Sequence, residues 1–282
     1  MVRLWAAAAL FLLMAPARAQ AAALEVISEA PAVATSVQRF VVHSQRVGRD
    51  FTVDVGVPAS FPTGQKAPVI YALDAGYGVA LPVARMLGST GAMQPAIVVA
   101  VAAAKDAATV RLVDMLYEPA TVSGKATGGG GAAFEGFLLE ELRPFIEARY
   151  PADPARSILF GHSVGGLFAA NLLARKPQAF NGYLIASPSV WADPAVLERV
   201  KAAKGASEKQ RVFLAVGGAE EPGMRQGAEQ LARSLTPQFQ VQARAYAGEG
   251  HMTYYPMLVA TAFPWLLPPV QSRQAPGGQP AS

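Results

Sequence analysis

A serine flanked by glycines separates two apolar segments, and this arrangement constrains the fold more than any other part of the sequence. Gly161-His-Ser-Val-Gly165 follows the strand-like run 158–160 and precedes the helix-like run 167–173. A G-x-S-x-G pentapeptide between a strand and a helix is typical of a nucleophile elbow, a sharp turn that exposes the serine hydroxyl. Its glycines allow strand and helix to approach closely. We therefore expect Ser163 to be a nucleophile at a strand end; the alternative is a tight glycine turn with a helix-capping serine.

Strand-length apolar segments alternate with helical patterns from about residue 36 onward. This alternation predicts an α/β fold with a mostly parallel central sheet and helices on both faces. Two early strands, at 40–43 and 51–57, are expected to pair as a hairpin, and a helix is expected over 134–150. Later strands are expected at 68–73, 96–103, 157–160, 183–186, 211–216 and 241–246.

One folded domain is expected, over residues 36–268. A leader at 1–19 and a lead-in at 20–35 precede it, and the tail 269–282, rich in Gly, Pro and Gln, is predicted to be disordered. Within the domain, residues 123–131 read SGKATGGGG. Small residues of this kind bury little surface, so we expect a mobile loop there.

The leader has the three parts of a secretory signal peptide: Arg3, an apolar run from Leu4 to Ala15, and Ala17-Arg-Ala19 as a cleavage site. Because a membrane-spanning helix needs about 20 apolar residues, this run favours export over a stable membrane anchor. We expect a periplasmic or secreted protein.

Composition excludes several kinds of chemistry. The chain has no cysteine and three histidines, which excludes disulfides and thiolate metal sites and leaves few ways to build an imidazole site. Lys and Arg number 24 and Asp and Glu 20; cleavage of the leader removes two arginines and leaves a net charge of +2. No clustered basic run is present, so we expect no nucleic-acid partner. We expect no metal or organic cofactor, and the oligomeric state stays open.

A serine nucleophile needs a base, and the chain offers three histidines. His43 lies in an early strand far before the elbow, and the turn directs the His162 side chain away from the serine. His251 follows the last predicted strand, in Gly248-Glu-Gly-His251, and the order serine, acid, histidine is the one expected for this fold. We expect His251 to be the base; a surface loop histidine is the alternative.

The acid is less well determined by the sequence. Glu220 and Glu221 follow the strand 212–216 and lie between the serine and the histidine in the chain. Adjacent side chains in an extended loop point apart, so only one glutamate should reach the histidine. We favour Glu220, then Glu221, with Asp193 as a third candidate.

Two backbone N–H groups are expected to bind the oxyanion that forms when the serine attacks a carbonyl. One belongs to Val164, directly after the nucleophile, and the other to the turn Asp74-Ala-Gly76 after an earlier strand. Gly76 suits this role because glycine permits close approach of the backbone to a ligand. A plain turn glycine is an equal alternative.

With these residues assigned, the stretch 67–266 resembles the Putative esterase family of the α/β-hydrolase fold, in particular its ferric-enterobactin and salmochelin esterases. The resemblance is carried by Tyr71-Ala-Leu-Asp-Ala-Gly76, Arg111-Leu-Val-Asp114 with Pro119, Gly128 to Tyr150, Gly161 to Gly166, Ala186-Ser-Pro-Ser-Val-Trp191 and Gly248-Glu-Gly-His251. Ala75 stands where the family has the glycine of a Leu-Asp-Gly turn.

The resemblance implies a serine esterase with Ser163 and His251 as its catalytic pair, Gly76 and Val164 as oxyanion donors, and Glu220 as the least secure member. It also implies a small-molecule ester substrate of the siderophore trilactone kind. The residues themselves give weaker support for this substrate. Arg111 could bind an anionic ligand, and three aromatic residues could line a cleft that accepts aromatic groups: Tyr77, Tyr117 and Trp191. The alternative is that these four residues pack in the core or at the rim of the cleft. Feruloyl and acetyl-xylan esterases, acyltransferases of the same fold and a non-catalytic binding protein are the alternatives.

Overall fold

Eight strands form the central sheet of the computed structural model, in the order β1-β2-β4-β3-β7-β8-β9-β10. They are β1 (Val37–Ser44), β2 (Arg49–Gly56), β3 (Ala67–Leu73), β4 (Ile97–Ala103), β7 (Ala152–His162), β8 (Gly182–Ala186), β9 (Arg211–Gly217) and β10 (Gln240–Tyr246). β1 and β2 form the predicted hairpin, and β2 pairs antiparallel with β4. All other neighbours in this sheet are parallel, which confirms the expected mostly parallel sheet.

The structure describes residues 37–58, 61, 64–73, 77–203, 210–236 and 238–269. The predicted leader and lead-in lie outside these residues, as does the predicted tail after residue 269.

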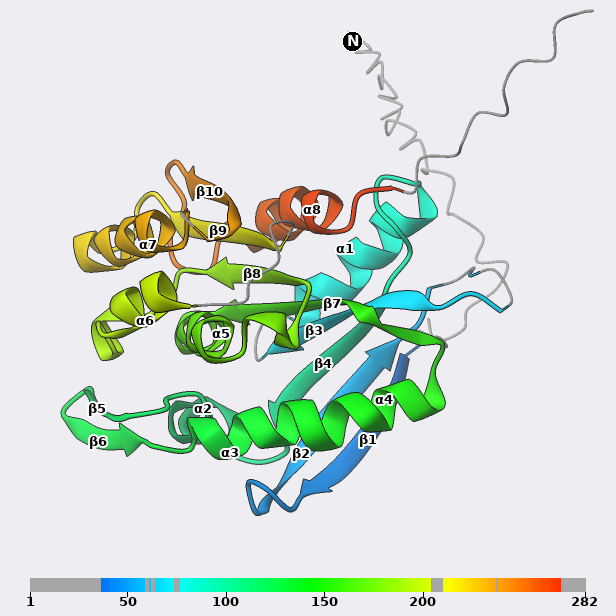
Figure 1. Ribbon diagram of the computed structural model, residues 1–282, viewed down its shortest axis with the longest axis horizontal. Helices are drawn as coiled ribbons and strands as arrows, with labels where there is room; N and C mark the ends of the chain where they lie inside the picture. The colour runs from blue at the N-terminus through cyan, green and yellow to red at the C-terminus, as the bar shows by residue number, and fades with distance from the viewer. Residues whose placement is uncertain are drawn as a thin grey trace, which may run out of the picture. The chain divides into compact units, whose positions relative to one another are not determined.

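Helices cover both faces of the sheet (Figure 1). Those of the structure are α1 (Tyr77–Ser89), α2 (Ala107–Asp114), α3 (Gly131–Gly136), α4 (Arg143–Arg149), α5 (Val164–Arg175), α6 (Val196–Ala202), α7 (Pro222–Leu235) and α8 (Tyr255–Leu266), with short 3₁₀ turns η3 (Pro177–Ala179) and η4 (Val190–Ala192). α1 and α8 pack together on one face, and α3 to α7 lie over the other.

β3 shows why the sheet needs helices on both sides. All seven of its residues are buried. Val69, Tyr71 and Leu73 point into the core under α4 and α5, whereas Ile70 and Ala72 point into the core under α1 and α8. Because side chains alternate between the faces of a strand, a continuously apolar strand requires cover on both.

The helix expected over 134–150 contains a wider turn in its middle. α3 continues into a π-helical turn, η2 (Phe137–Leu142), and then into α4. Pro144 lies in the first turn of α4 and has no N–H to donate to the preceding turn. The π turn therefore directly precedes the point where the regular hydrogen-bond pattern is interrupted.

The prediction of a mobile loop at 123–131 is wrong. β5 (Pro119–Val122) and β6 (Lys125–Gly128) pair as an antiparallel hairpin, and α3 begins at Gly131. Ser123 and Gly124 both have positive φ, 49° and 77°, as a two-residue hairpin turn requires. A Cβ at Gly128 would lie 2.6 Å from the Glu118 carbonyl oxygen. Ser123 and Gly124 therefore form the hairpin turn, and Gly128 allows its backbone to lie close to that of Glu118.

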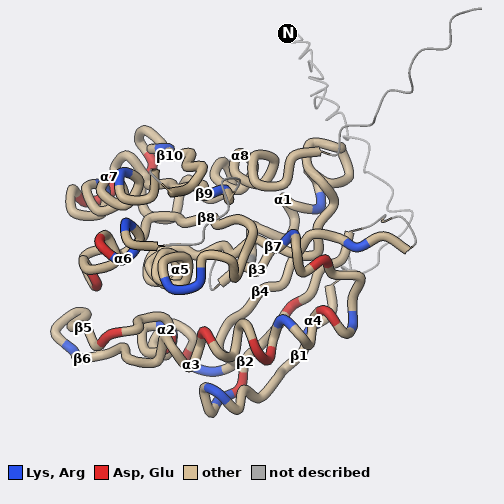
Figure 2. Tube along the Cα trace, viewed as in Figure 1, with Lys and Arg blue, Asp and Glu red and all other residues tan. Residues whose placement is uncertain are grey.

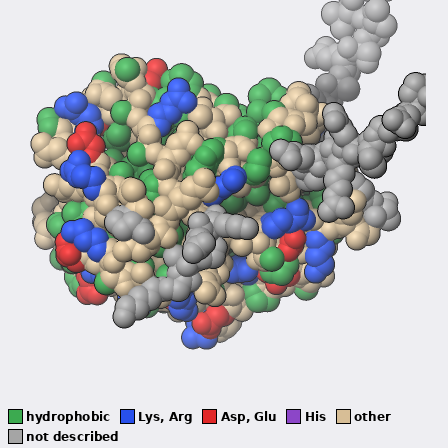
Figure 3. Space-filling view, turned by 45° about the horizontal axis from the view of Figure 1, so that its top comes forward, with side chains coloured by type: hydrophobic (Ala, Val, Ile, Leu, Met, Phe, Trp, Pro, Cys, Tyr) green, Lys and Arg blue, Asp and Glu red, His purple; other side chains and the backbone are tan. Residues whose placement is uncertain are grey.

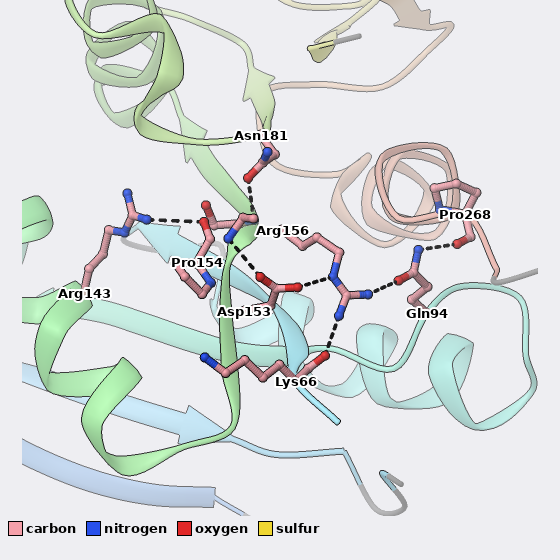
Figure 4. A network of polar contacts seen from close by, with 10 residues as sticks. Lys66, Gln94, Arg143, Asp153, Pro154, Arg156, Asn181 and Pro268 are labelled. Atoms are coloured by element: carbon pink, nitrogen blue, oxygen red, sulfur yellow. Dashed lines mark hydrogen bonds and ion pairs between the residues drawn. The ribbon is translucent and has the colours of Figure 1, made fainter. Parts of the chain in front are cut away.

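The amino-terminal edge of the parallel strands is held by Arg156, near the start of β7 (Figure 4). Its Nε donates to Asp153 Oδ2 at 2.6 Å and its Nη1 to Gln94 Oε1 at 2.8 Å, while Nη2 donates to the carbonyl of Lys66 just before β3. One guanidinium therefore connects the first residues of β7 with the segments that precede β3 and β4. The opposite, carboxyl-terminal edge carries the loops described next.

Basic and acidic residues are interspersed along the outer helices (Figure 2). Pairs such as Arg143–Glu147 on α4 and Glu229–Arg233 on α7 lie one helical turn apart. The face shown in Figure 3 likewise mixes basic, acidic and hydrophobic side chains. Among the described residues, no helix combines the length and apolar character needed to cross a membrane.

Candidate active site

Ser163 occupies a strained turn between β7 and α5. Its φ of 59° and ψ of −118° are rare for a residue with a side chain and cost on the order of 1–3 kcal/mol. The Ser163 N–H donates to the Ala186 carbonyl at 2.9 Å, and the Ser163 carbonyl accepts the N–H groups of Leu167 and Ser189, both at 3.0 Å. These bonds to β8, α5 and the loop after β8 hold the turn in place.

The glycines of this turn are required by space. A Cβ at Gly161 would lie 2.1 Å from the carbonyl oxygen of Gly165, and one at Gly166 would lie 2.8 Å from that of Ala186. Neither distance is possible without movement of the backbone. The strand and helix can therefore meet at Ser163 only because these positions carry no side chain.

Val164 is the first residue of α5, so its N–H lies in the helical turn that has no intrahelical acceptor. The helix amino terminus directs such N–H groups and the positive end of its dipole toward negative charge. The second predicted oxyanion donor, Gly76, lies outside the described residues. Tyr77 begins α1 directly after it.

Glu220 and His251 are in direct contact. Glu220 follows β9 and His251 follows β10, and the distance from Glu220 Oε2 to His251 Nδ1 is 2.7 Å. The glutamate side chain is 2% exposed and the histidine side chain 40% exposed. Burial alone would raise the pKa of Glu220, but hydrogen bonds from His251, Ser187 and the Gly217 N–H outweigh it and hold that pKa below its ordinary value.

The other two candidate acids lie elsewhere. Glu221 is exposed and flanks the start of α7. Asp193 accepts hydrogen bonds from Asn171, at 3.0 Å, and from Arg199, and so joins α5 to α6. Of the three carboxylates weighed from the sequence, Glu220 is the one that contacts His251.

His162 contacts His251, which the sequence analysis did not anticipate. The two ring centroids are 4.3 Å apart, and the distance from His162 Nε2 to the His251 carbonyl oxygen is 2.9 Å. Burial, reinforced by the nearby His251, lowers the pKa of His162 to about 3. The ring is therefore neutral at neutral pH and donates Nε2–H to this carbonyl. Because His162 immediately precedes Ser163, this bond attaches the His251 loop to the elbow.

The Ser163 hydroxyl lies 3.2 Å from the hydroxyl of Ser189, a buried residue of the loop after β8. It makes no hydrogen bond to His251, although both residues belong to the described part of the chain. Catalytic hydrogen bonds are often long in ligand-free enzymes and shorten when substrate binds.

A cleft of about 620 Å³ opens beside the two histidines. Its lining includes His162, His251 and the predicted Arg111, whose Nη2 lies 3.4 Å from the His162 carbonyl oxygen. Trp191 lies on η4, is 49% exposed and does not belong to the described lining of this cleft. Tyr117 stacks on Phe168 at 5.5 Å, in the core on the α5 side of the sheet.

The cleft also contains an ion pair that sequence reasoning missed. Arg39 on β1 binds Asp54 on β2 through two hydrogen bonds, of 2.6 and 2.7 Å. The alternating apolar residues Phe51, Val53 and Val55 place Asp54 on the opposite face of the strand. That alternation could have revealed the ion pair, because a carboxylate within a strand of a central sheet is expected to have a basic or hydrogen-bonding partner.

A family model described as "Putative esterase" matches residues 44–265. The ferri-bacillibactin esterase BesA of Bacillus subtilis (strain 168) is 30% identical over 257 residues, which cover 81% of this chain and 89% of that protein.

Solved structures show the same fold. The BES protein from Bacillus cereus superposes with a TM-score of 0.76 at 25% identity, over 86% of this chain and 99% of that one. The siderophore hydrolase EstA from Aspergillus nidulans superposes with a TM-score of 0.71 at 23% identity, over 86% of this chain and 98% of that one.

Proposed function

Because the chain belongs to the Putative esterase family of α/β-hydrolases, we propose that it is an exported serine esterase that cleaves carboxylic esters through an acyl-enzyme on Ser163. One observation carries the proposal: Glu220 binds His251 at 2.7 Å, and the same histidine lies against the elbow through its contact with His162. A carboxylate, an imidazole and an elbow serine at one sheet edge are the groups that this chemistry needs.

We propose the following reaction at these residues. The Ser163 hydroxyl, which contacts Ser189 in the structure, must turn toward His251 for the attack. The imidazole takes the proton as Oγ bonds to the ester carbon, and Glu220 stabilises the imidazolium. The N–H groups of Val164 and Gly76 bind the oxyanion.

His251 then gives the proton to the departing alcohol, which leaves the acyl group on Ser163. A water molecule repeats the sequence: His251 accepts its proton, its oxygen attacks the acyl carbon, and the carboxylic acid departs as Ser163 regains its proton. No step calls for a metal or an organic cofactor.

We further propose an iron-siderophore ester as the substrate. The proposal is supported by the relatives, one described as a ferri-bacillibactin esterase and one as a siderophore hydrolase. It is also supported by the Arg111 guanidinium group of the cleft, because iron-bound oxygen ligands carry negative charge, whereas the charge of Arg39 is balanced by Asp54. Export agrees with the predicted leader at residues 1–19, which lies outside the described residues.

The test is turnover by the purified protein of p-nitrophenyl butyrate and of ferric and iron-free siderophore trilactones. The proposal predicts hydrolysis that is lost in Ser163→Ala and His251→Gln and a preference for the siderophore esters. Product analysis with added alcohol separates hydrolysis from acyl transfer. Hydrolysis that persists in Ser163→Ala would rule out this serine as nucleophile, and equal rates on all esters would rule out the substrate assignment.

A further inference from the structure

Two buried hydroxyl groups lie behind Glu220, on the side away from His251. Ser187 Oγ is 2.5 Å from Glu220 Oε1 and 2.5 Å from the phenolic oxygen of Tyr254. Both Ser187 and Tyr254 are fully buried, and Glu220 is 7% exposed. The proposed reaction uses neither hydroxyl.

The direction of each hydrogen bond is determined by the available protons. An ionised carboxylate only accepts, so Ser187 donates its single proton to Glu220 Oε1. The Ser187 oxygen then accepts a proton from Tyr254. Burial raises the pKa of the Tyr254 phenol above its ordinary value, so the phenol keeps this proton.

The two oxygens of Glu220 therefore have separate partners. Oε1 accepts from Ser187 and from the Gly217 N–H, which is 2.7 Å away. Oε2 faces His251 Nδ1 at 2.7 Å. With Oε1 held by two donors, the carboxylate cannot rotate without breaking buried hydrogen bonds, which is costly.

The backbone at Ser187 indicates that the hydroxyl matters at this position. Ser187 has a φ of 40°, in the left-handed region, and its N–H donates to the Ala215 carbonyl at 2.7 Å. Glycine adopts such a φ more easily than serine. The positive φ alone would favour glycine at this position, so the hydrogen bond to Glu220 is the feature that requires a serine.

Tyr254 closes the arrangement because it belongs to the same loop as His251. Its ring is fixed by stacking on Tyr246, with centroids 5.2 Å apart. The loop that supplies His251 to one oxygen of Glu220 thus also supports the other oxygen, through Ser187.

We propose that Ser187 and Tyr254 are positioning residues that hold Glu220 in the orientation in which it binds His251. This inference deepens the proposed function and rests on it. It predicts that loss of either hydroxyl slows the chemical step and leaves substrate binding unchanged.

The test compares Ser187→Ala and Tyr254→Phe with two matched controls, Ser157→Ala and Tyr183→Phe. Ser157 and Tyr183 are also fully buried, but they lie on β7 and β8 away from Glu220. On p-nitrophenyl butyrate we expect kcat to fall roughly 10- to 100-fold in Ser187→Ala, with KM unchanged, because a hydrogen bond to the charged Glu220 is lost. Tyr254→Phe loses only the neutral hydrogen bond to Ser187, so its kcat should fall less, by roughly 3- to 10-fold. The controls should retain wild-type kcat.

Two further measurements separate positioning from a purely structural role. Ser187→Gly removes the hydroxyl but relieves the positive φ, so it should be more stable than Ser187→Ala and yet equally slow. In a Glu220→Gln background, Ser187→Ala and Tyr254→Phe should change kcat less than about twofold. The effects of substitutions are not additive when the residues act through one group, here the Glu220 carboxylate.

The outcomes are distinct. A wild-type protein that hydrolyses no ester would refute the proposed function itself. If the wild type is active, the positioning roles are overturned by kcat values that follow melting temperature across all variants, by unchanged kcat in Ser187→Ala and Tyr254→Phe, or by full additivity with Glu220→Gln.

Discussion

Acidification is expected to destabilise this protein through His162. The residue is 4% exposed, its ring lies between those of His251 and Tyr255 at 4.3 and 4.9 Å, and its Nε2–H is bound to a carbonyl oxygen. Burial and the nearby His251 lower its pKa from 6.5 to about 3 in the folded protein. In the unfolded chain the imidazole is free to titrate with its ordinary pKa.

The sign and size of the effect follow from this difference. Between pH 6.5 and pH 3 the unfolded chain binds a proton at His162 and the folded protein does not, so stability falls as the pH falls. The stabilisation is complete above pH 6.5 and is lost progressively toward pH 3. Within this range each pH unit of acidification lowers the free energy of unfolding by about 1.4 kcal/mol. At pH 4.5 the loss of stability through His162 is therefore about 3 kcal/mol.

The assay is urea unfolding at pH 7.5 and at pH 4.5, with His162→Gln as the partner variant. Glutamine does not titrate, and its terminal amide can donate to the His251 carbonyl as Nε2 does. The free energy of unfolding should fall by about 3 kcal/mol more in the wild type than in the variant between these pH values. An equal pH dependence in the two proteins would show that His162 does not keep a lowered pKa in the folded state.

Two other substitutions test the site directly. Gly161→Ala should lower the free energy of unfolding by about 3 kcal/mol or more, or prevent folding, because its Cβ would lie 2.1 Å from a carbonyl oxygen. The control Gly223→Ala on α7 should be tolerated, because its Cβ would enter open space. Thermal melts compare the two variants. Glu220→Gln should lower kcat roughly 100-fold or more, because the proposed carboxylate partner of His251 is lost, whereas Glu221→Gln should stay near the wild type. Steady-state kinetics on p-nitrophenyl butyrate compare the two variants.

Features encoded by adjacent residues were predictable from the sequence. The strand before Ser163, the helix after it and the glycines around it predict the elbow, and all lie within about fifteen residues. The parallel sheet follows from apolar strands such as β3, whose buried residues serve both faces.

Features that depend on the direction of one side chain could be ranked from the sequence, as Glu220 was ahead of Glu221, or were missed. Glu220 and Glu221 are neighbours in a turn, and the choice between them depends on the bond from the Glu220 N–H to the Gly217 carbonyl, at 3.2 Å, which closes the turn that brings Glu220 to His251. The contact of His162 with His251 joins residues far apart in the chain, so no local pattern shows it.

The glycine-rich segment shows a different limit. Composition predicts flexibility there because small residues bury little surface. It does not reveal that Ser123 and Gly124 form a hairpin turn, or that Gly128 is required where two backbone segments meet. Glycine that permits motion and glycine that permits close contact look the same in a sequence.

In the proposed mechanism Ser163 carries the acyl group during turnover. This role is tested by incubating the protein with a fluorophosphonate, digesting it and locating the adduct by mass spectrometry. We expect a single adduct on the peptide that contains Ser163, none in Ser163→Ala, and strongly slowed labelling in His251→Gln. An adduct on another residue, or equal labelling of Ser163→Ala, would contradict it.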